Sequence, residues 1–277
     1  MNLEKDKTYS ILSISENNIS QTMNGMQMDM TNKSVSKISF AVVSKEADYM
    51  LVKVTFDSVA SEMNMPGRNI STSSVKPGDP KNPDEFMNTA FYILSRNPLD
   101  VKISYIGKII EILNAKPTLA LVATSLDSLP QVSQMQMRPM LEMILNEASL
   151  KSMVETIICY FPENGETDNW STKMSVSAQG MTLAINSKYK IKEQKGNEII
   201  ITGESTIEPA GDGRMKMNGM DLTFEMRGMG NGELNIDANS GWIINGKSKQ
   251  RMKGSVTANG MNIPMEIESK IEYKKVN

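Results

Sequence analysis

Apolar and polar residues alternate through most of the chain, and four of these alternating runs begin directly after a turn signal. Each has Asn-Gly or Gln-Gly, then Met, then apolar residues at every second position, at residues 24–30, 179–185, 218–224 and 259–265. Asn-Gly favours a two-residue type I′ turn, in which both central residues need positive φ. Alternation with a period of two is typical of a strand with one buried face. The pattern therefore predicts four hairpins with Met on the inner face.

The register of each hairpin follows from pairing residues outward from the turn. In the last hairpin, this places Met252 opposite Ile267 on one face, and Lys253 opposite Glu266 on the other. One register thus gives apolar pairs on one side and complementary charges on the other, whereas a slip by one residue would reverse both faces. In the other three hairpins the same count pairs Met174 with Ile185, Met215 with Leu222, and Ile19 with Met30.

Further elements are predicted around these hairpins. Strands are expected at residues 9–14, 18–23, 26–43, 49–60, 101–105 and 108–113. The polar, Pro-rich residues 68–83 predict an exposed loop. The start of a helix is indicated at Asn82, which would be the N-cap, with Pro83 at the first helical position and two acidic residues in the first turn. We therefore expect a helix from there to about Ser95. Lys195-Gly196-Asn197, Asn231-Gly232 and Asn245-Gly246 are further turn signals.

The middle of the chain has a helical period instead. Pro117 opens a first short helix that ends before Pro130. A second follows the i, i+3, i+4, i+7 spacing of Met137, Met140, Leu141 and Ile144. After Ser149, an apolar stripe of the same spacing continues to Phe161 and predicts a third helix that ends at Pro162.

These patterns divide the chain into a β-rich half at residues 1–114, a helical segment at 115–162 and a β-rich half at 163–277. Both halves open with a turn-Met hairpin, a long Lys-rich strand and a charged turn, which favours an internal duplication. The halves would then form one compact unit or two pseudo-repeat lobes. A sheet with this many strands cannot stay flat. We expect an α+β, mostly antiparallel fold: a strongly curved sheet, or two related sheets, wrapped around a few central helices.

Composition excludes several kinds of chemistry. The chain has no His, so Ser-His-Asp and Cys-His nucleophiles and the usual zinc ligand sets are excluded. The single Cys159 lies in an apolar run and is expected to be a buried structural thiol. A net charge of −2 gives no electrostatic reason to expect nucleic acid. No stretch approaches 18 consecutive apolar residues, so no transmembrane helix is expected, and nothing in the sequence calls for a cofactor.

Two segments resemble a known group of proteins. The strand at 101–105 with Gly107-Lys108-Ile109-Ile110-Glu111-Ile112, and the closing segment Gly241-Trp242 to Gln250, are similar to a family of uncharacterised exported proteins and lipoproteins of Bacteroidota, a domain of unknown function with Met-rich strands. The resemblance covers most of the chain. It implies a cell-envelope location, either periplasmic or anchored at the outer membrane, and no catalytic residue. The start at Met1–Lys7 resembles neither a signal peptide nor a lipobox, so peripheral attachment would need a lipid anchor outside this sequence.

Methionine is the compositional outlier, with 24 residues against 6 Phe and 2 Trp. Met is unbranched and polarizable, so it adapts to apolar partners of varied shape. The leading hypothesis is a non-enzymatic envelope protein that binds a lipid or other apolar ligand on the concave face of its sheet. The residues expected to line that face are Met26, Met28, Met181, Met220, Met261 and Met140.

Three alternatives stay open. Met could serve only as core filler in a surface, adhesive or scaffold module, for which exposed Trp170 and Trp242 would be evidence. Met23, Met26, Met28 and Met30 with Met63 and Met65 also resemble thioether clusters that suit Cu(I). An enzyme has the least support, because the Gly-rich residues 228–232 lie between predicted strands and do not open a phosphate-binding helix.

Overall fold

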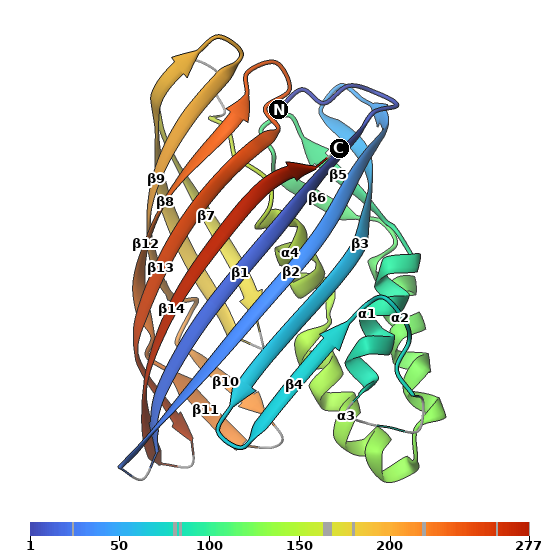
Figure 1. Cartoon of the computed structure of the whole chain (residues 1–277), viewed down its shortest axis with the longest axis vertical. Helices are drawn as coiled ribbons and strands as arrows, with labels where there is room; N and C mark the ends of the chain where they lie inside the picture. Colours follow the sequence, from blue (N-terminus) through green and yellow to red (C-terminus); the bar gives the residue numbers. More distant parts are fainter. Residues whose placement is uncertain are drawn as a thin grey trace.

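The fold is a single antiparallel sheet of 14 strands with four α-helices, seen in a computed structural model (Figure 1). It describes residues 1–277 except 24, 80, 81, 83, 84, 163–167, 179, 180, 218, 219, 259 and 277. The strands are β1 (Thr8–Met23), β2 (Met26–Lys45), β3 (Tyr49–Met65), β4 (Arg68–Ser73), β5 (Leu99–Ser104), β6 (Ile109–Ile112), β7 (Asn169–Ala178), β8 (Met181–Lys195), β9 (Glu198–Pro209), β10 (Arg214–Met217), β11 (Met220–Phe224), β12 (Arg227–Asp237), β13 (Ile243–Ala258) and β14 (Met261–Val276). The helices are α1 (Phe86–Arg96), α2 (Ala115–Ser125), α3 (Gln131–Ile144) and α4 (Glu147–Glu155), with a 3₁₀ turn at Leu126–Ser128.

The two β-rich parts of the chain belong to one sheet. Its order is β6-β5-β3-β2-β1-β14-β13-β12-β9-β8-β7, and β4, β10 and β11 pair beside this path. The first and last strands join the parts, since β1 pairs with β14 from Ser10↔Val276 to Gln21↔Met265. The sheet curves strongly, with α4 inside the curve and α1, α2 and α3 beside β3 and β4 (Figure 1). The expected curved antiparallel sheet around a few helices is confirmed.

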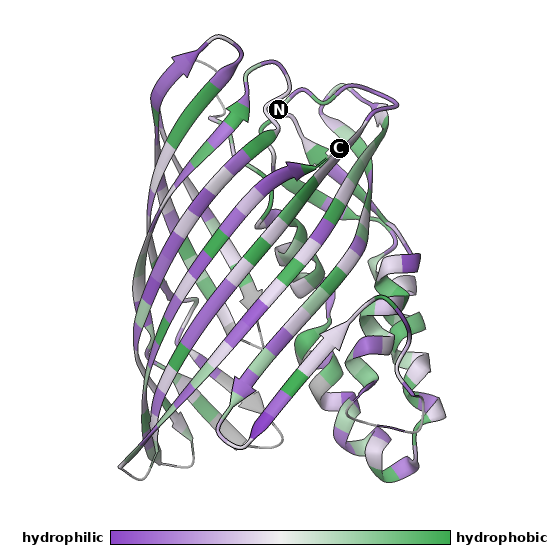
Figure 2. Cartoon of the chain, in the orientation of Figure 1, coloured by the Kyte–Doolittle hydropathy of each residue, from purple (hydrophilic) through white to green (hydrophobic). Residues whose placement is uncertain are grey.

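The four predicted hairpin registers are also confirmed. Met252 pairs with Ile267 and Lys253 with Glu266, and the structure also pairs Met174 with Ile185, Met215 with Leu222 and Ile19 with Met30. Gly25 and Gly260 have φ of 77° and 78°, as a type I′ turn requires. Figure 2 shows the alternation of apolar and polar residues along the long strands.

Two predictions for residues 68–86 were wrong. Residues 68–73 are strand β4 and not loop, because Pro66-Gly67 makes a tight turn that pairs Met65 with Arg68. Helix α1 begins at Phe86 with Glu85 at its N-cap and not with Asn82, while Pro83 lies outside the described residues.

The signals Asn231-Gly232 and Asn245-Gly246 do not form turns. They lie inside β12 and β13, where Asn231 pairs with Lys249 and Gly246 with Leu234. Both strands are also paired on their other edge, β12 with β9 and β13 with β14. The bonds of two ladders outweigh a local turn preference. The turn predicted at Lys195-Gly196-Asn197 is present between β8 and β9.

Helix α4 is shorter than its apolar stripe predicts. It starts with a capping box between Asn146 and Ser149 but ends at Glu155 rather than Phe161. The backbone that follows bonds to distant parts of the chain: Phe161 N donates to Ile106 O at 2.9 Å, and Thr156 O accepts from the Tyr273 hydroxyl at 2.9 Å. These tertiary bonds replace helical ones, so residues 156–161 lie along the inside of the sheet.

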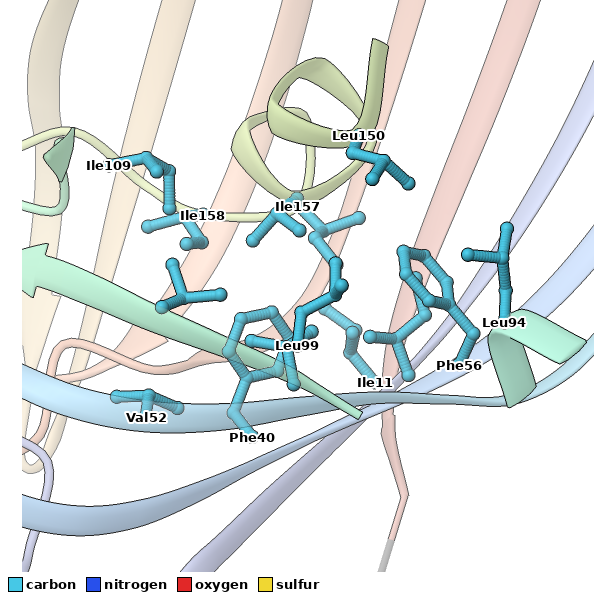
Figure 3. Packing of buried hydrophobic residues seen from close by; sticks show 14 of the residues in the cluster. Ile11, Phe40, Val52, Phe56, Leu94, Leu99, Ile109, Leu150, Ile157 and Ile158 are labelled. Carbon is cyan, nitrogen blue, oxygen red and sulfur yellow. The ribbon is translucent and has the colours of Figure 1, made fainter. Parts of the chain in front are cut away.

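The hydrophobic core lies between the helices and the strands of the first half. Ile11, Phe40, Phe56, Leu99 and Leu150 are essentially excluded from solvent. Figure 3 shows side chains of α4 and the segment after it close to Phe56 and Leu99 of the sheet. Cys159 is buried in this core, as the sequence predicts. Within the described residues, no helix has the length and apolar character needed to span a membrane.

Candidate ligand-binding site

A row of apolar side chains crosses the inner face of the sheet. Residues that pair directly across an antiparallel ladder point to the same face. The register links one residue from each of eight neighbouring strands, and seven of the eight are apolar. From β7 to β2 the row is Met174, Ile185, Ile207, Gly228, Met252, Ile267, Ile19 and Met30. We call this set the apolar row.

The apolar row faces the inside of the curve. In β14, Ile267 is six residues from Tyr273 and therefore on the same face, and the Tyr273 hydroxyl donates to the segment after α4. Ile207 is buried, but the other six apolar members are only half-buried. The apolar row thus extends beyond the region that the helices cover, whereas the next row of the inner face toward α4 is polar and includes Thr172, Ser187 and Gln250.

The opposite face of the same strands is charged. Glu266 contacts Lys253 at 2.9 Å and Arg251 at 2.5 Å. Hydrogen bonds from Lys253 and Arg251 lower the pKa of the Glu266 carboxyl. Similar cross-strand pairs join Lys192 to Glu233 and Lys247 to Glu272. Exposed pairs of this kind add little stability, but they show that this face of the sheet is exposed to solvent.

The charged face also has a wide depression of about 1110 Å³, lined by side chains such as Lys173, Lys188 and Arg251. These long side chains stand on the solvent side of the sheet and leave gaps between them. The depression is more open to solvent than a typical ligand pocket and most of its lining residues are charged or polar, so it is a poor candidate for a specific apolar site.

The inner face holds a smaller, better enclosed pocket of about 170 Å³. It lies between the end of α4 and strands β7, β8, β9, β12, β13 and β14. Two members of the apolar row, Met174 and Ile185, form part of its wall, so the pocket and the row are continuous. Polar residues also line it, including Glu155, Tyr160 and Gln250. We call this space the α4 pocket.

Glycines on β12 shape the floor of the α4 pocket. Three successive inner positions of this strand are Gly228, Gly230 and Gly232. A Cβ at 230 would lie 2.6 Å from the Ser205 hydroxyl, and one at 232 would lie 2.9 Å from the carbonyl of Lys247. Neighbouring strands approach closely on the inside of the curve, and glycine permits this. The Gly-rich segment thus serves the curvature of the sheet.

Tyr160, Tyr189 and Tyr273 line the α4 pocket, and Trp170 packs behind Tyr189. Trp170 stacks on Tyr189 with ring centroids 5.4 Å apart, and its Nε1 donates to Tyr160 O at 2.8 Å. Trp242 is only 2% exposed and packs edge-on against Phe40. Neither Trp is an exposed anchor, which argues against an adhesive role for these two side chains. Burial raises the pKa of Tyr189 and of Tyr273, so both phenols stay neutral at physiological pH.

Glu155 is the buried charge of this pocket. It is 6% exposed, at the last position of α4. Its carboxylate lies 3.6 Å from Lys151 Nζ. Burial first, and then the charge of Glu155 and a hydrogen bond to it, raise the pKa of the Tyr160 phenol. Tyr160 is therefore a neutral donor to the Glu155 carboxylate.

A second cavity, of about 340 Å³, lies on the other side of α4. Hydroxyl side chains of β1, β2 and β3 line its sheet side, and Met87 and Phe91 of α1 line its helix side. Thr156 borders both this cavity and the α4 pocket. The end of α4 thus separates two spaces within the hollow of the sheet.

Of the six methionines predicted as site residues, the three whose side chains are described, Met26, Met28 and Met261, do not line the α4 pocket. Met26 is 69% exposed and Met261 is 48% exposed, both at the first position after a hairpin turn. Met28 is half-buried and pairs with Gln21. Met181 and Met220 start β8 and β11, and Met140 lies in α3, but the side chains of these three are outside the described part of the structure. Their role in binding stays a prediction.

Sequence reasoning missed the residues that the pocket brings together. The turn-Met motif indicated the ends of hairpins as the site. The members of the apolar row instead lie well away from the four Asn-Gly or Gln-Gly turns, near the middle of the sheet. The predicted pairs Met174/Ile185 and Met252/Ile267 were the available signal for the row. Nothing local marks Glu155 or Tyr160. Across the described residues, no three His, Cys, Asp or Glu side chains cluster as a metal site, and a thioether site for Cu(I) stays an untested hypothesis.

Comparison with solved structures finds a similar fold in lipovitellin, in a structure concerned with lipid–protein interactions. The match has a TM-score of 0.52 and 12% identity, and it covers 99% of this chain and 25% of that one. The chain thus spans about a quarter of the lipovitellin chain, and at this identity the likeness shows the fold alone. An outer membrane channel from Pseudomonas putida F1 aligns with 6% identity, 99% and 97% coverage and a TM-score of 0.29, too low to carry an argument.

No curated protein matches the chain. A family model, described as Family of unknown function (DUF6263), matches residues 47–243. This match covers well over half of the 277 residues, and the chain therefore belongs to the DUF6263 family.

Proposed function

We propose that this protein is a non-enzymatic component of the cell envelope that binds a lipid or another apolar molecule on the concave face of its sheet. One observation carries the proposal: the apolar row is continuous across eight strands, yet six of its members remain half-buried. Monomeric proteins rarely leave a contiguous apolar surface of this kind without a binding role. A ligand in the hollow would cover it.

The dimensions suit an acyl chain. Neighbouring strands lie about 4.8 Å apart, so seven spacings give the apolar row a length of roughly 34 Å along the curve. One leaflet of a bilayer has a hydrocarbon depth of about 15 Å, which approximates the length of one acyl chain. The row therefore offers enough surface for one or two chains. Its Met and Ile side chains adapt to such a ligand without fixed polar contacts.

Two further considerations support the proposal by analogy. The fold is shared with part of lipovitellin, a protein described in terms of its lipid interactions. Fold likeness alone does not carry function. The envelope location rests on the resemblance of the 101–112 and 241–250 segments to exported proteins and lipoproteins.

A matched pair of variants tests the proposal. Ile19→Asp places a charge in the apolar row, whereas Ser20→Asp places the same charge one residue away on the outer face. We expect Ile19→Asp to weaken binding of the neutral apolar probe N-phenyl-1-naphthylamine by at least about tenfold, because a carboxylate in an apolar site is costly. Ser20→Asp should bind within about twofold of the parent protein under the same rule. Equal binding by both variants, with thermal melts showing both folded, would refute the proposed site.

One observation favours the alternative of a scaffold module with Met as filler. Helix α3 exposes Val132 (69%) and Met135 (72%), which are three residues apart and therefore neighbours on a surface that a protein partner could cover. A Val132→Lys, Met135→Lys double variant separates this role from ligand binding. In a scaffold module it should lose binding to the protein partner while still binding N-phenyl-1-naphthylamine like the parent protein.

A further inference from the structure

The α4 pocket identifies the chemistry of one end of the ligand. We infer that the ligand is an amphipath whose polar end donates hydrogen bonds, as an amine or a hydroxyl does, and that this end sits against Glu155. The apolar remainder then follows Met174 and Ile185 into the apolar row. This inference rests on the proposed function and adds the class of head group to it.

The carboxylate of Glu155 is the group that would accept hydrogen bonds from the ligand. Glu155 is almost fully buried and lines the α4 pocket. An ionised carboxylate offers about four acceptor positions. Lys151 takes one of them at 3.6 Å, and the hydroxyl of Tyr160, which lines the same pocket, takes another. Positions therefore remain for donors that come from the pocket.

Among the described residues, no ammonium or guanidinium group points into the pocket. Three charged residues line it, Glu155, Glu204 and Lys247. Glu204 is exposed, and the ammonium of Lys247 pairs with Glu272 on the outer face of the sheet. The remaining polar lining consists of neutral groups, among them Ser187, Ser205, Ser248 and Gln250. An anionic head group such as a carboxylate or phosphate would meet a buried negative charge, whereas a donor would complete its hydrogen bonds.

The volume of the α4 pocket limits the size of the head group. The pocket volume of about 170 Å³ is close to that of an engineered 150 Å³ cavity in another protein that binds benzene. It takes a head group of about six heavy atoms and excludes a large glycan or a complete phospholipid head group. Met174, Ile185 and Ile271 form its apolar wall, so the route from the head group leads directly onto hydrocarbon-binding surface.

Three probes with the same ten-carbon chain test the inference: decylamine, decanol and decanoate, each competing with N-phenyl-1-naphthylamine at neutral pH. The parent protein should bind decylamine and decanol at least about tenfold more tightly than decanoate, since hydrogen bonds to a buried charge are worth about 1.5–3 kcal/mol. Glu155→Gln should tighten the binding of decanoate and so reduce the preference of the protein for decylamine and decanol over decanoate. Glu233→Gln removes a carboxylate on the outer face of β12, which pairs with Lys192 and does not line the pocket, and should leave all three affinities unchanged.

Each outcome is decisive. Equal binding of the three probes by the parent protein, or tightest binding of decanoate, overturns the head-group inference while leaving the proposed function standing. If the naphthylamine probe binds but none of the three compounds displaces it, the head-group inference is overturned. If the parent protein binds neither the naphthylamine probe nor any of the three compounds, both the inference and the proposed function are overturned. The ranking by the parent protein needs no variant, so the inference can be tested even if Glu155→Gln does not fold.

Discussion

Crowding on the inner face of β12 gives a prediction that depends directly on the geometry of the curved sheet. Gly228 and Gly230 are two residues apart on the same face of the same strand, so Gly→Ala at each is a matched comparison. A Cβ at 228 would lie 2.5 Å from the carbonyl oxygen of Arg251, which is backbone. A Cβ at 230 would lie 2.6 Å from the Ser205 hydroxyl, which can rotate away.

The two substitutions should therefore differ in their effect on the free energy of unfolding. Both gain about 0.4–1 kcal/mol because alanine restricts the unfolded chain. Gly228→Ala must also displace the backbone of β13, and overpacking of this kind costs about 1–3 kcal/mol. We expect Gly228→Ala to destabilise the protein by about 1–2 kcal/mol net, and Gly230→Ala to stay within about 0.5 kcal/mol of the parent.

Urea unfolding followed by tryptophan fluorescence measures this difference. Trp242 is buried and Trp170 is stacked on Tyr189, so both report the loss of packing around the sheet. Equal slopes of free energy against urea in the two variants would show that the unfolded states are comparable. If Gly228→Ala is no less stable than Gly230→Ala, the close approach of β12 and β13, and with it the reasoning on curvature, is refuted.

Three further predictions concern a helix cap, an ion pair and the thiol. Asn146→Ala removes the side-chain cap of α4 and should lower the free energy of unfolding by about 1 kcal/mol in urea titrations, whereas no change would show that the cap is redundant. The pKa of the Glu266 carboxyl is lowered in the folded state, so this group stabilises the fold above its unfolded pKa, and that contribution is lost as the pH falls through the folded pKa. On acidification through this range, the Glu266→Gln variant should therefore lose less stability than the parent protein. Identical profiles of stability against pH for the two proteins would contradict the pairing of Glu266 with Lys253 and Arg251. Burial raises the pKa of Cys159 to about 12, so the native thiol should not react with a maleimide at pH 8 and should react promptly in urea; rapid labelling of the native protein would contradict its burial.

Local patterns predicted the hairpins because their pairing is local. The Asn-Gly turns and the period of two fix the partner of each residue, as in Lys253↔Glu266 and Ile19↔Met30. The curvature followed from the number of strands. The same reasoning failed at Asn231-Gly232 and Asn245-Gly246, where pairing on both edges of each strand outweighs a turn signal.

Long-range features were beyond sequence reasoning. Pairing of β1 with β14, which unites the two parts in one sheet, joins residues as distant as Ser10 and Val276. The early end of α4 depends on a bond from Tyr273 to Thr156. Glu155 and Gln250 likewise line one pocket although they are distant in the sequence, and no local signal marks either residue as part of a site.

The central claim is that the hollow of the sheet holds an apolar molecule. Native mass spectrometry of protein purified without detergent, beside a denatured control, tests it most directly. The account predicts a reproducible mass excess that disappears on denaturation, extracts into organic solvent and is reduced in Ile19→Asp but not in Ser20→Asp. A bare polypeptide mass, both as purified and after incubation with decylamine or decanol, would contradict it.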